Sequence, residues 1–139
     1  MFRTLIACAL TFAAASSFAQ SGGLSPSVNP DNMYAHGGQG TSSTITFTNN
    51  GPGFASNVVT TFVYASGTRN NGQRLTKEVD TCNGATVAVG GTCKVTISFD
   101  DACPAAKGTA LQYTLGVTDA SGRSVSVPVW GNSQGGFCN

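Results

Sequence analysis

The sequence predicts an all-β protein built as an antiparallel two-sheet sandwich of about seven to eight strands. Apolar residues occupy every second position in Ile45-Thr46-Phe47, in residues 95–99 and in residues 111–117. This period of two is typical of strands with one buried face. Turn-forming sequences such as Asn70-Asn71-Gly72 and Gly90-Gly91 separate the runs. No helical periodicity extends over three turns anywhere after the first twenty residues.

The spacing of these runs gives eight candidate strands. They are expected at residues 24–28, 42–48, 58–64, 75–80, 86–89, 93–99, 110–118 and 124–130. Many short strands at close spacing, enriched in Thr, Val and Phe, fit a sandwich better than a barrel or an open sheet. The Asn50-Gly51-Pro52 turn is expected to carry the chain from one sheet to the other, with Gly51 as the residue able to adopt a positive φ there.

Residues 1–19 have the features of a signal peptide. Arg3 precedes an apolar stretch, and Ser17 and Ala19 place small residues at the two positions that a signal peptidase reads. Cleavage is therefore expected before Gln20. The apolar stretch is shorter than the roughly 20 residues that a membrane-spanning helix needs, so no membrane span is expected.

The mature chain, residues 20–139, has the size of one domain. Of the seven Lys and Arg residues only Arg3 is lost with the signal peptide, which leaves six bases against six acids. Because this balance is neutral, binding to nucleic acid through charge is not expected. The protein is predicted to be secreted or periplasmic.

Four cysteines remain in the mature chain, and an even number in an oxidising compartment predicts two disulfides. Cys82 and Cys93 flank a local excursion, and we favour a bond between them because it closes a short loop. Cys138 needs a partner to hold the Gly-rich tail, which leaves Cys103 for it. Four cysteines allow three pairings, and the sequence alone leaves the choice open. Their spacings do not provide the closely paired ligands of a zinc site.

Two segments resemble known bacterial modules. Residues 46–59, with Asn49-Asn50-Gly51-Pro52 followed by Ala55 and a pair of valines, resemble bacterial surface repeats with an Asn-x-Gly-Pro signature. Residues 80–99, with a Cys, a Gly-rich turn and a second Cys leading into an alternating strand, are similar to immunoglobulin-like domains of the Hydin and major-sperm-protein type. The resemblance implies an immunoglobulin-like sandwich outside the cytoplasm and carries no catalytic residues with it.

The mature chain is predicted not to be an enzyme and to need no cofactor. Its one histidine, His36, lies in a Gly-rich turn, and no acid pair suited to glycoside hydrolysis is recognisable among its six acids. Asp100 and Asp101 are adjacent and are expected to solvate a turn. The glycine pairs lack the lysine and the helix of a phosphate-binding loop. Neither catalytic residues nor metal ligands are therefore assigned.

Candidate binding residues are Trp130, Arg69 and Arg74. Trp130, at the end of the last long strand, suits a core or edge position, but it would be the first choice for a binding hot spot if it were exposed. Arg69 and Arg74 form, with Lys77, the only local basic cluster, in a loop expected to be solvated.

The sequence therefore predicts a non-enzymatic secreted or periplasmic interaction module. A rigid sandwich would present loops such as residues 64–74 and 100–107 to an unknown protein or glycan partner outside the cytoplasm. One alternative is a structural surface subunit that assembles weakly through sheet edges, since few charges would block an edge. A small extracellular hydrolase is the other.

Overall fold

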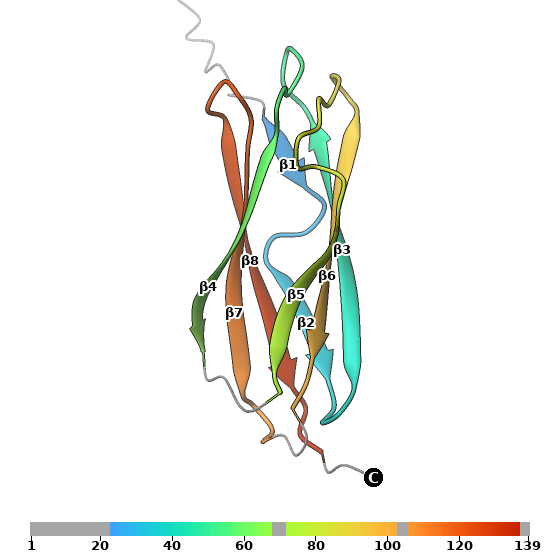
Figure 1. Ribbon diagram of the computed structural model, residues 1–139, viewed down its shortest axis with the longest axis vertical. Coiled ribbons are helices and arrows are strands. Elements are labelled where there is room, and N and C mark those ends of the chain that lie inside the picture. Colours follow the sequence, from blue (N-terminus) through green and yellow to red (C-terminus); the bar gives the residue numbers. More distant parts are fainter. Residues whose placement is uncertain (1–22, 68–71, 103–105, 137–139) are drawn as a thin grey trace, which may run out of the picture.

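Two facing sheets make up the computed structural model, which describes residues 23–67, 72–102 and 106–136 (Figure 1). The predicted signal peptide, Arg69, Cys103 and Cys138 lie outside these residues. The described strands are β1 (Leu24–Pro26), β2 (Asp31–Ala35), β3 (Gly40–Asn49), β4 (Val59–Gly67), β5 (Arg74–Asp80), β6 (Thr92–Asp100), β7 (Ala110–Thr118) and β8 (Ser124–Ser133).

Each sheet has four strands. The first sheet has the order β1-β3-β6-β5, and the second sheet has the order β2-β8-β7-β4. All neighbouring strands are antiparallel except β2 and β8, which are parallel. The predicted two-sheet sandwich is confirmed, and within the described residues no helix is long and apolar enough to cross a membrane.

The core lies between the sheets and is filled by alternate residues of both. Phe47 and Phe99 enter it from the first sheet, and Leu115 and Val129 enter it from the second; all four are fully buried. Gly131 of β8 makes room for the Phe99 ring, because a Cβ atom at this position would lie 2.3 Å from Phe99 Cδ2. The period of two read from the sequence is therefore the packing pattern of the core.

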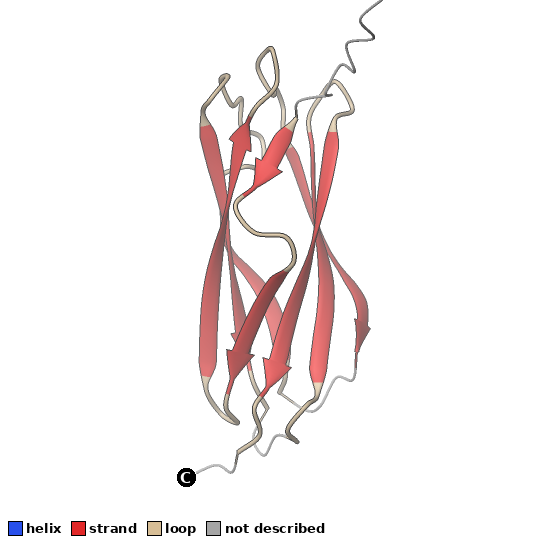
Figure 2. Cartoon of the chain, turned by 180° about the vertical axis from the view of Figure 1, so that it is seen from behind, coloured by secondary structure: helices blue, strands red, loops and turns tan. Residues whose placement is uncertain are grey.

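The N-terminal strand is split between the two sheets, and the apolar pattern of the sequence does not predict this split. β1 pairs with β3 in the first sheet, and the chain then crosses to the second sheet, where β2 pairs with β8 (Figure 2). β2 escapes the apolar pattern because the first of its inward-facing residues is Asp31, which is buried together with Met33 and Ala35. Only two apolar residues then remain to mark the strand.

The prediction of a strand at residues 86–89 is wrong. This segment makes a single antiparallel bridge, in which Ala55 and Val87 exchange backbone hydrogen bonds of 2.9 and 2.8 Å. Val87 is buried, so its apolar character is real. Its partner, however, is the connection between β3 and β4 rather than a strand, and no ladder can extend from it.

The connection between β3 and β4 does cross between the sheets, but Gly51 does not provide a positive φ. Among the described residues of this connection, Asn57 has φ 45°. The crossing begins with buried Asn49, whose side-chain amide donates to the Gly53 carbonyl at 2.8 Å and to the Val87 carbonyl at 2.9 Å. Its Oδ1 accepts from the Gly51 amide at 3.0 Å. The turn is held by a side chain rather than by backbone freedom at Gly51.

The favoured disulfide between Cys82 and Cys93 is present, with the two Cα atoms 5.0 Å apart. Both residues are buried. The expected bond between Cys103 and Cys138 involves residues outside those described and stays a prediction, so one disulfide of the expected two is observed.

Candidate functional site

Trp130 lies on the outer face of the second sheet. Its neighbours in β8, Val129 and Gly131, are buried and face the core, so the alternation turns Trp130 outward, where it is partly exposed. It is therefore neither a core residue nor an edge plug. Its place on the surface of a rigid sheet makes it available as a contact residue.

Polar and aromatic side chains surround Trp130 in strand register. Asn32 of β2 pairs with it on one side and Gln112 of β7 on the other. Tyr34, which is 59% exposed, lies one strand across and two residues along. Both residues alternate with buried ones on neighbouring strands, so both face outward on the same side of the sheet. Trp130 and Tyr34 thus form a two-ring platform flanked by amide groups.

Charge is distributed very unequally between the two sheets. The strands of the first sheet carry six charged residues, Arg74, Lys77, Glu78, Asp80, Lys94 and Asp100. The strands of the second sheet carry Asp31 alone, and its side chain is buried. The outer face of the second sheet therefore has no charged side chain in its strands.

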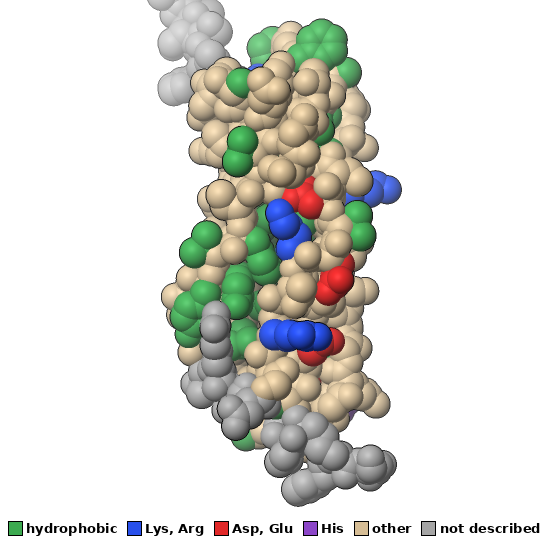
Figure 3. All heavy atoms as spheres, in the orientation of Figure 1, with side chains coloured by type: hydrophobic (Ala, Val, Ile, Leu, Met, Phe, Trp, Pro, Cys, Tyr) green, Lys and Arg blue, Asp and Glu red, His purple; other side chains and the backbone are tan. Residues whose placement is uncertain are grey.

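On one side of the sandwich the edge strands are β4 of the second sheet and β5 of the first, and we call this the β4–β5 side. Phe62 and Tyr113 stack there with ring centroids 4.8 Å apart, and Tyr64 meets Tyr113 edge-on at 5.6 Å. In Figure 3 hydrophobic side chains gather along β4 on this side, and charged side chains follow β5. The first sheet thus presents its charges beside an aromatic cluster.

Asp80 forms hydrogen bonds with several groups on the β4–β5 side. Its Oδ1 accepts from the backbone amides of Cys82 and Asn83, both at 2.9 Å. Its Oδ2 accepts from Lys77 Nζ at 2.6 Å and from the Thr60 hydroxyl. Burial acts to raise the pKa of this carboxyl, but the hydrogen bonds outweigh burial and hold the pKa below its ordinary value. Asp80 is therefore a structural carboxylate that joins β5 to β4 and to the disulfide loop.

Arg74 is not brought together with Trp130. It begins β5 in the first sheet, and its Nε lies 2.8 Å from Asp100 Oδ2. Hydrogen bonding to this carboxylate and its charge raise the pKa of Arg74. The pair is exposed and contributes little to stability. Lys77 of the same basic cluster is engaged by Asp80.

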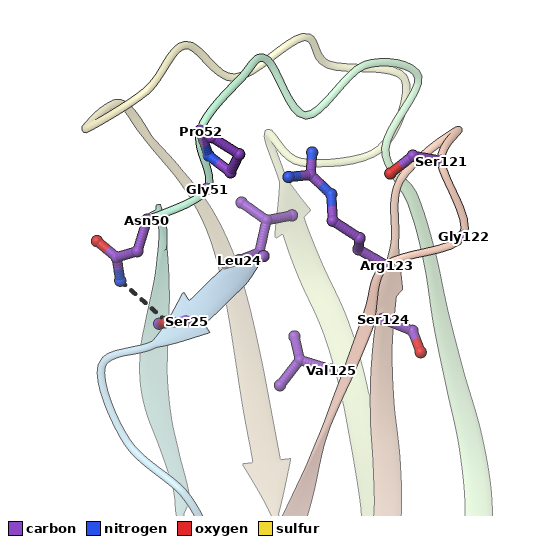
Figure 4. A pocket seen from close by; sticks show the side chains of 11 residues that line it. Leu24, Ser25, Asn50, Gly51, Pro52, Ser121, Gly122, Arg123, Ser124 and Val125 are labelled. Atoms are coloured by element: carbon purple, nitrogen blue, oxygen red, sulfur yellow. Dashed lines mark hydrogen bonds between the residues drawn. The ribbon is translucent and has the colours of Figure 1, made fainter. Parts of the chain in front are cut away.

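A hollow of about 900 Å³ opens at the end of the sandwich where β7 turns into β8 (Figure 4). Arg123 is the only charged residue in its lining. The Arg123 guanidinium lies 2.5 Å from Asp119 Oδ2 and also donates to the Phe54 carbonyl at 3.1 Å. Arg123 thus clamps the β7–β8 turn to the β3–β4 connection.

Asp119 is the buried partner in this clamp. Burial acts to raise the pKa of its carboxyl, but hydrogen bonds from Ser121 and Arg123 outweigh burial, so the pKa lies below its ordinary value. The remaining lining of the hollow is dominated by Gly, Ser and Pro together with Leu24 and Val125. The one charged residue in the lining of this hollow, Arg123, thus has a structural role in the pair with Asp119.

The opposite end of the sandwich contains a polar cluster around Asp101, a residue predicted from the sequence to solvate a turn. Asp101 is buried instead. Gln73 Nε2 donates to its Oδ1 at 2.6 Å, and the Ser133 hydroxyl donates to its Oδ2 at 2.7 Å. The sequence does not distinguish the two neighbouring acids at the end of β6. Asp100 is partly exposed and Asp101 is buried because their side chains lie on opposite sides of the chain.

The described residues contain no group of three or more His, Cys, Asp or Glu side chains that could hold a metal ion. His36 is exposed after β2, and its Nδ1 lies 3.4 Å from the Gly135 carbonyl oxygen. The loops that the sequence analysis expects to contact a partner lie partly outside the described residues, at 68–71 and 103–105.

No protein-family model matches the sequence, and no curated protein matches it either. Solved structures with similar folds include the secreted serine protease VesC from Vibrio cholerae, at 19% identity and a TM-score of 0.59. The similarity covers 82% of this chain and 24% of the protease chain.

Two further solved structures have the same architecture. The PapD-like domain 7 of human CEP192 matches at 10% identity and a TM-score of 0.52, over 100% of this chain and 99% of that one. The sialic acid binding region of a Streptococcus sanguinis adhesin matches at 9% identity and a TM-score of 0.53, over 83% of this chain and 30% of the adhesin chain. The fold is an immunoglobulin-like β-sandwich. At these identities the similarity concerns the fold alone.

Proposed function

We propose that this chain is a non-enzymatic secreted or periplasmic binding module of bacterial type. It contacts its partner through the outer face of the second sheet, around Trp130. A protein or a glycan outside the cytoplasm is the partner class, and neither nucleic acid nor a membrane span is involved.

One observation carries this proposal: the second sheet turns an uncharged face outward with two aromatic rings on it. Trp and Tyr are the residues most enriched at binding hot spots, because they offer a large rigid surface with a polar tip. Trp130 and Tyr34 lie on strands rather than loops, so the fold holds them in fixed positions. A platform already held in place binds at a lower entropic cost.

The extracytoplasmic location is supported by the Cys82–Cys93 disulfide, since such bonds persist in oxidising compartments. The resemblance of residues 46–59 to bacterial surface repeats, and of residues 80–99 to the Hydin and major-sperm-protein group, agrees with it. A sialic acid binding region of an adhesin shares this fold over 30% of its chain, which agrees with a binding role outside the cytoplasm.

The absence of catalysis is proposed from the roles of the acidic residues. Asp80 and Asp119 are held by hydrogen bonds within their own turns, Asp100 pairs with Arg74, and Asp101 is buried in a polar cluster. A hydrolase of the glycosidase type would need two carboxyl groups facing each other across a cleft. The described acids support the fold instead.

The proposal is tested with labelled mature protein added to cell envelopes and to concentrated medium of the organism that produces it. We expect retention of the wild-type protein, loss of retention in Trp130→Ala and Tyr34→Ala, and no change in Thr44→Ala. Thr44 lies on the outer face of the first sheet, paired with Thr96. Equal retention of all four proteins would place binding elsewhere.

A structural subunit that assembles through sheet edges is the second candidate, because β4 is an uncharged edge strand. Its sequence from Val59 to Gly67 has neither charge nor proline, which are common protections of an edge. Asn83 caps one end by accepting from the Thr60 amide at 3.3 Å, and a bulge between Tyr64 and Ser66 disturbs the other end. The free stretch is short, so self-association would be weak.

Sedimentation velocity over a range of protein concentrations separates the two candidates. Assembly through β4 would raise the mean mass with concentration, and Val63→Lys would abolish the rise. A constant monomer mass for both proteins would eliminate the structural-subunit candidate.

A further inference from the structure

We propose that the outer face of the second sheet binds a neutral polysaccharide chain. This inference rests on the proposed binding function of the same face and adds the chemical class of the ligand. It follows from three properties of the face: the kind of polar groups beside its rings, the absence of charge in its strands, and its place away from the hollow at the end of the sandwich.

The groups around Trp130 suit the two surfaces of a sugar. The face of an aromatic ring carries a partial negative charge. It therefore attracts the C–H groups on the apolar face of a pyranose. Asn32 and Gln112 stand on either side of Trp130. Each amide both donates and accepts, so it can pair with a hydroxyl in either role. Ser66 already donates to Gln112 Oε1 at 2.8 Å, which holds this amide in place.

The face favours glycans over a protein partner because its polar groups are spread among its apolar ones. Protein interfaces concentrate apolar contact at their centre and place polar groups at the rim. Residues that pair across β8, β7 and β4 form rows on this face. The row next to Trp130 contains Pro128, Thr114 and Val63. The row beyond it contains Ser126, Gly116 and Thr61. Hydroxyl groups thus recur across the whole face, as a ligand with many hydroxyls requires.

The absence of charge excludes an acidic ligand from the same face. A sulfated or carboxylated chain would lose hydration without meeting a cation, since the strands of the second sheet contain neither Lys nor Arg. Asp31, their one acid, is turned into the core and accepts from Ser43 at 3.1 Å. A neutral chain has no such cost.

The shape of the face favours an extended chain over a single sugar. The hollow of about 900 Å³ lies at the end of the sandwich and is lined by none of Asn32, Tyr34 and Trp130. An open surface buries little of a small ligand, so affinity must come from several sugar units in contact at once. Trp130 and Tyr34 provide two stacking positions for neighbouring units of one chain.

Affinity gel electrophoresis with soluble polysaccharides tests the inference. The probes are neutral β-glucan, xylan, galactomannan and pullulan, and acidic alginate and polygalacturonate. Trp130 is the only tryptophan of the chain, so its fluorescence reports directly on the proposed site in a parallel titration. Each variant is first shown to be folded by its urea midpoint.

We expect at least one neutral polysaccharide to retard the wild-type protein and to shift the Trp130 emission. Trp130→Ala and Tyr34→Ala should each weaken that binding at least about tenfold, while Thr44→Ala binds like wild type. Tyr34 is the cleaner variant because its side chain is more than half exposed.

Three results would overturn the inference. Retardation by acidic polysaccharides alone would reverse the assigned ligand charge. Neutral binding that survives both Trp130→Ala and Tyr34→Ala would place the site on another surface. A complete lack of polysaccharide binding, with envelope retention still dependent on Trp130, would refute the glycan class and leave the proposed binding function standing. If that retention were absent as well, both would fail.

Discussion

Buried polar side chains hold the loops at both ends of the sandwich. At one end, the Asn49 side chain bonds to the backbone of Gly51, Gly53 and Val87. At the same end, Asp119 accepts from the Arg123 amide within the β7–β8 turn. At the other end, Asp101 accepts from Gln73, Ser133 and the Ala102 amide. Removing one of these side chains would leave its partners buried without a hydrogen bond, and that is costly.

Asp101→Ala is therefore expected to lower the free energy of unfolding by about 1 to 3 kcal/mol. The adjacent variant Asp100→Ala is the matched control, because it removes only an exposed ion pair with Arg74 and should have a much smaller effect. Both are measured by urea unfolding with the disulfides intact. Equal losses in the two variants would show that the buried cluster does not stabilise this end.

Gly131 is the residue at which the core tolerates no side chain. Gly131→Ala would place a Cβ atom 2.3 Å from Phe99 Cδ2, and such overpacking typically costs about 1 to 3 kcal/mol. Gly53→Ala is the control, since nothing lies within 4 Å of a Cβ atom there. Combining Gly131→Ala with Phe99→Leu should cost less than the sum of the single changes. Strict additivity would contradict the proposed clash.

At the scale of elements, the end of β5 ties the two sheets together. Asp80 bonds to Lys77 on its own strand, to Thr60 on β4 and to the turn that carries Cys82. The disulfide then fastens that turn to Cys93 of β6. This junction joins β4 and β5, the edge strands on one side of the sandwich.

The low pKa of Asp80 makes the stability of this junction depend on pH. Since the folded state holds the carboxyl ionised to a lower pH than the unfolded chain does, the unfolded chain takes up protons first as pH falls. The stabilisation is complete above the unfolded value of about 3.9 and is lost as pH falls through the lower folded value. Asp119 acts in the same direction.

We expect urea midpoints of the wild type to fall as pH is lowered below about 4, and Asp80→Asn to start from a lower midpoint and fall less steeply. Asp119→Asn should act in the same way. Parallel curves for Asp80→Asn and wild type would mean that the Asp80 carboxylate does not contribute to stability.

The strands with continuous apolar alternation could be predicted from the sequence, and those whose inward residues are polar could not. β6 and β7 have Val, Ile, Phe and Leu at their inward positions, so their patterns are unambiguous. β2 has Asp31 among its inward residues, so its apolar alternation is too short to predict a strand. Residues 86–89 have the pattern but no strand beside them, and pairing is a property of the fold rather than of the segment.

The candidate site could be anticipated in part. Trp130 is identifiable because it is the only tryptophan and ends an alternating segment. The platform around it depends on β2, which supplies Asn32 and Tyr34 by pairing with β8 over a long separation in sequence. Arg74 shows the opposite case: the two described members of the local basic cluster, Arg74 and Lys77, form ion pairs with Asp100 and Asp80.

At the scale of the whole molecule, charge is separated between the two sheets of one sandwich. The strands of the first sheet carry both signs close together, as in the pairs of Lys77 with Asp80 and Arg74 with Asp100. The strands of the second sheet leave their outer face to aromatic, amide and hydroxyl groups. Solvation of charge and recognition of a neutral ligand thus belong to opposite sides of the protein.

This separation predicts how binding responds to salt. Raising the ionic strength from about 0.1 to 1 M shortens the Debye length from about 10 to 3 Å and weakens contacts that rely on exposed charge. Binding to a neutral polysaccharide through Trp130 and Tyr34 should therefore change by less than about twofold over this range. Affinity electrophoresis or Trp130 fluorescence measures the change.

A Thr114→Lys variant is the control, because any binding it gains to alginate should disappear at high salt. If instead the wild type lost most of its binding in salt, charged side chains outside the strands of the second sheet would contact the ligand, and the uncharged face could not be the site.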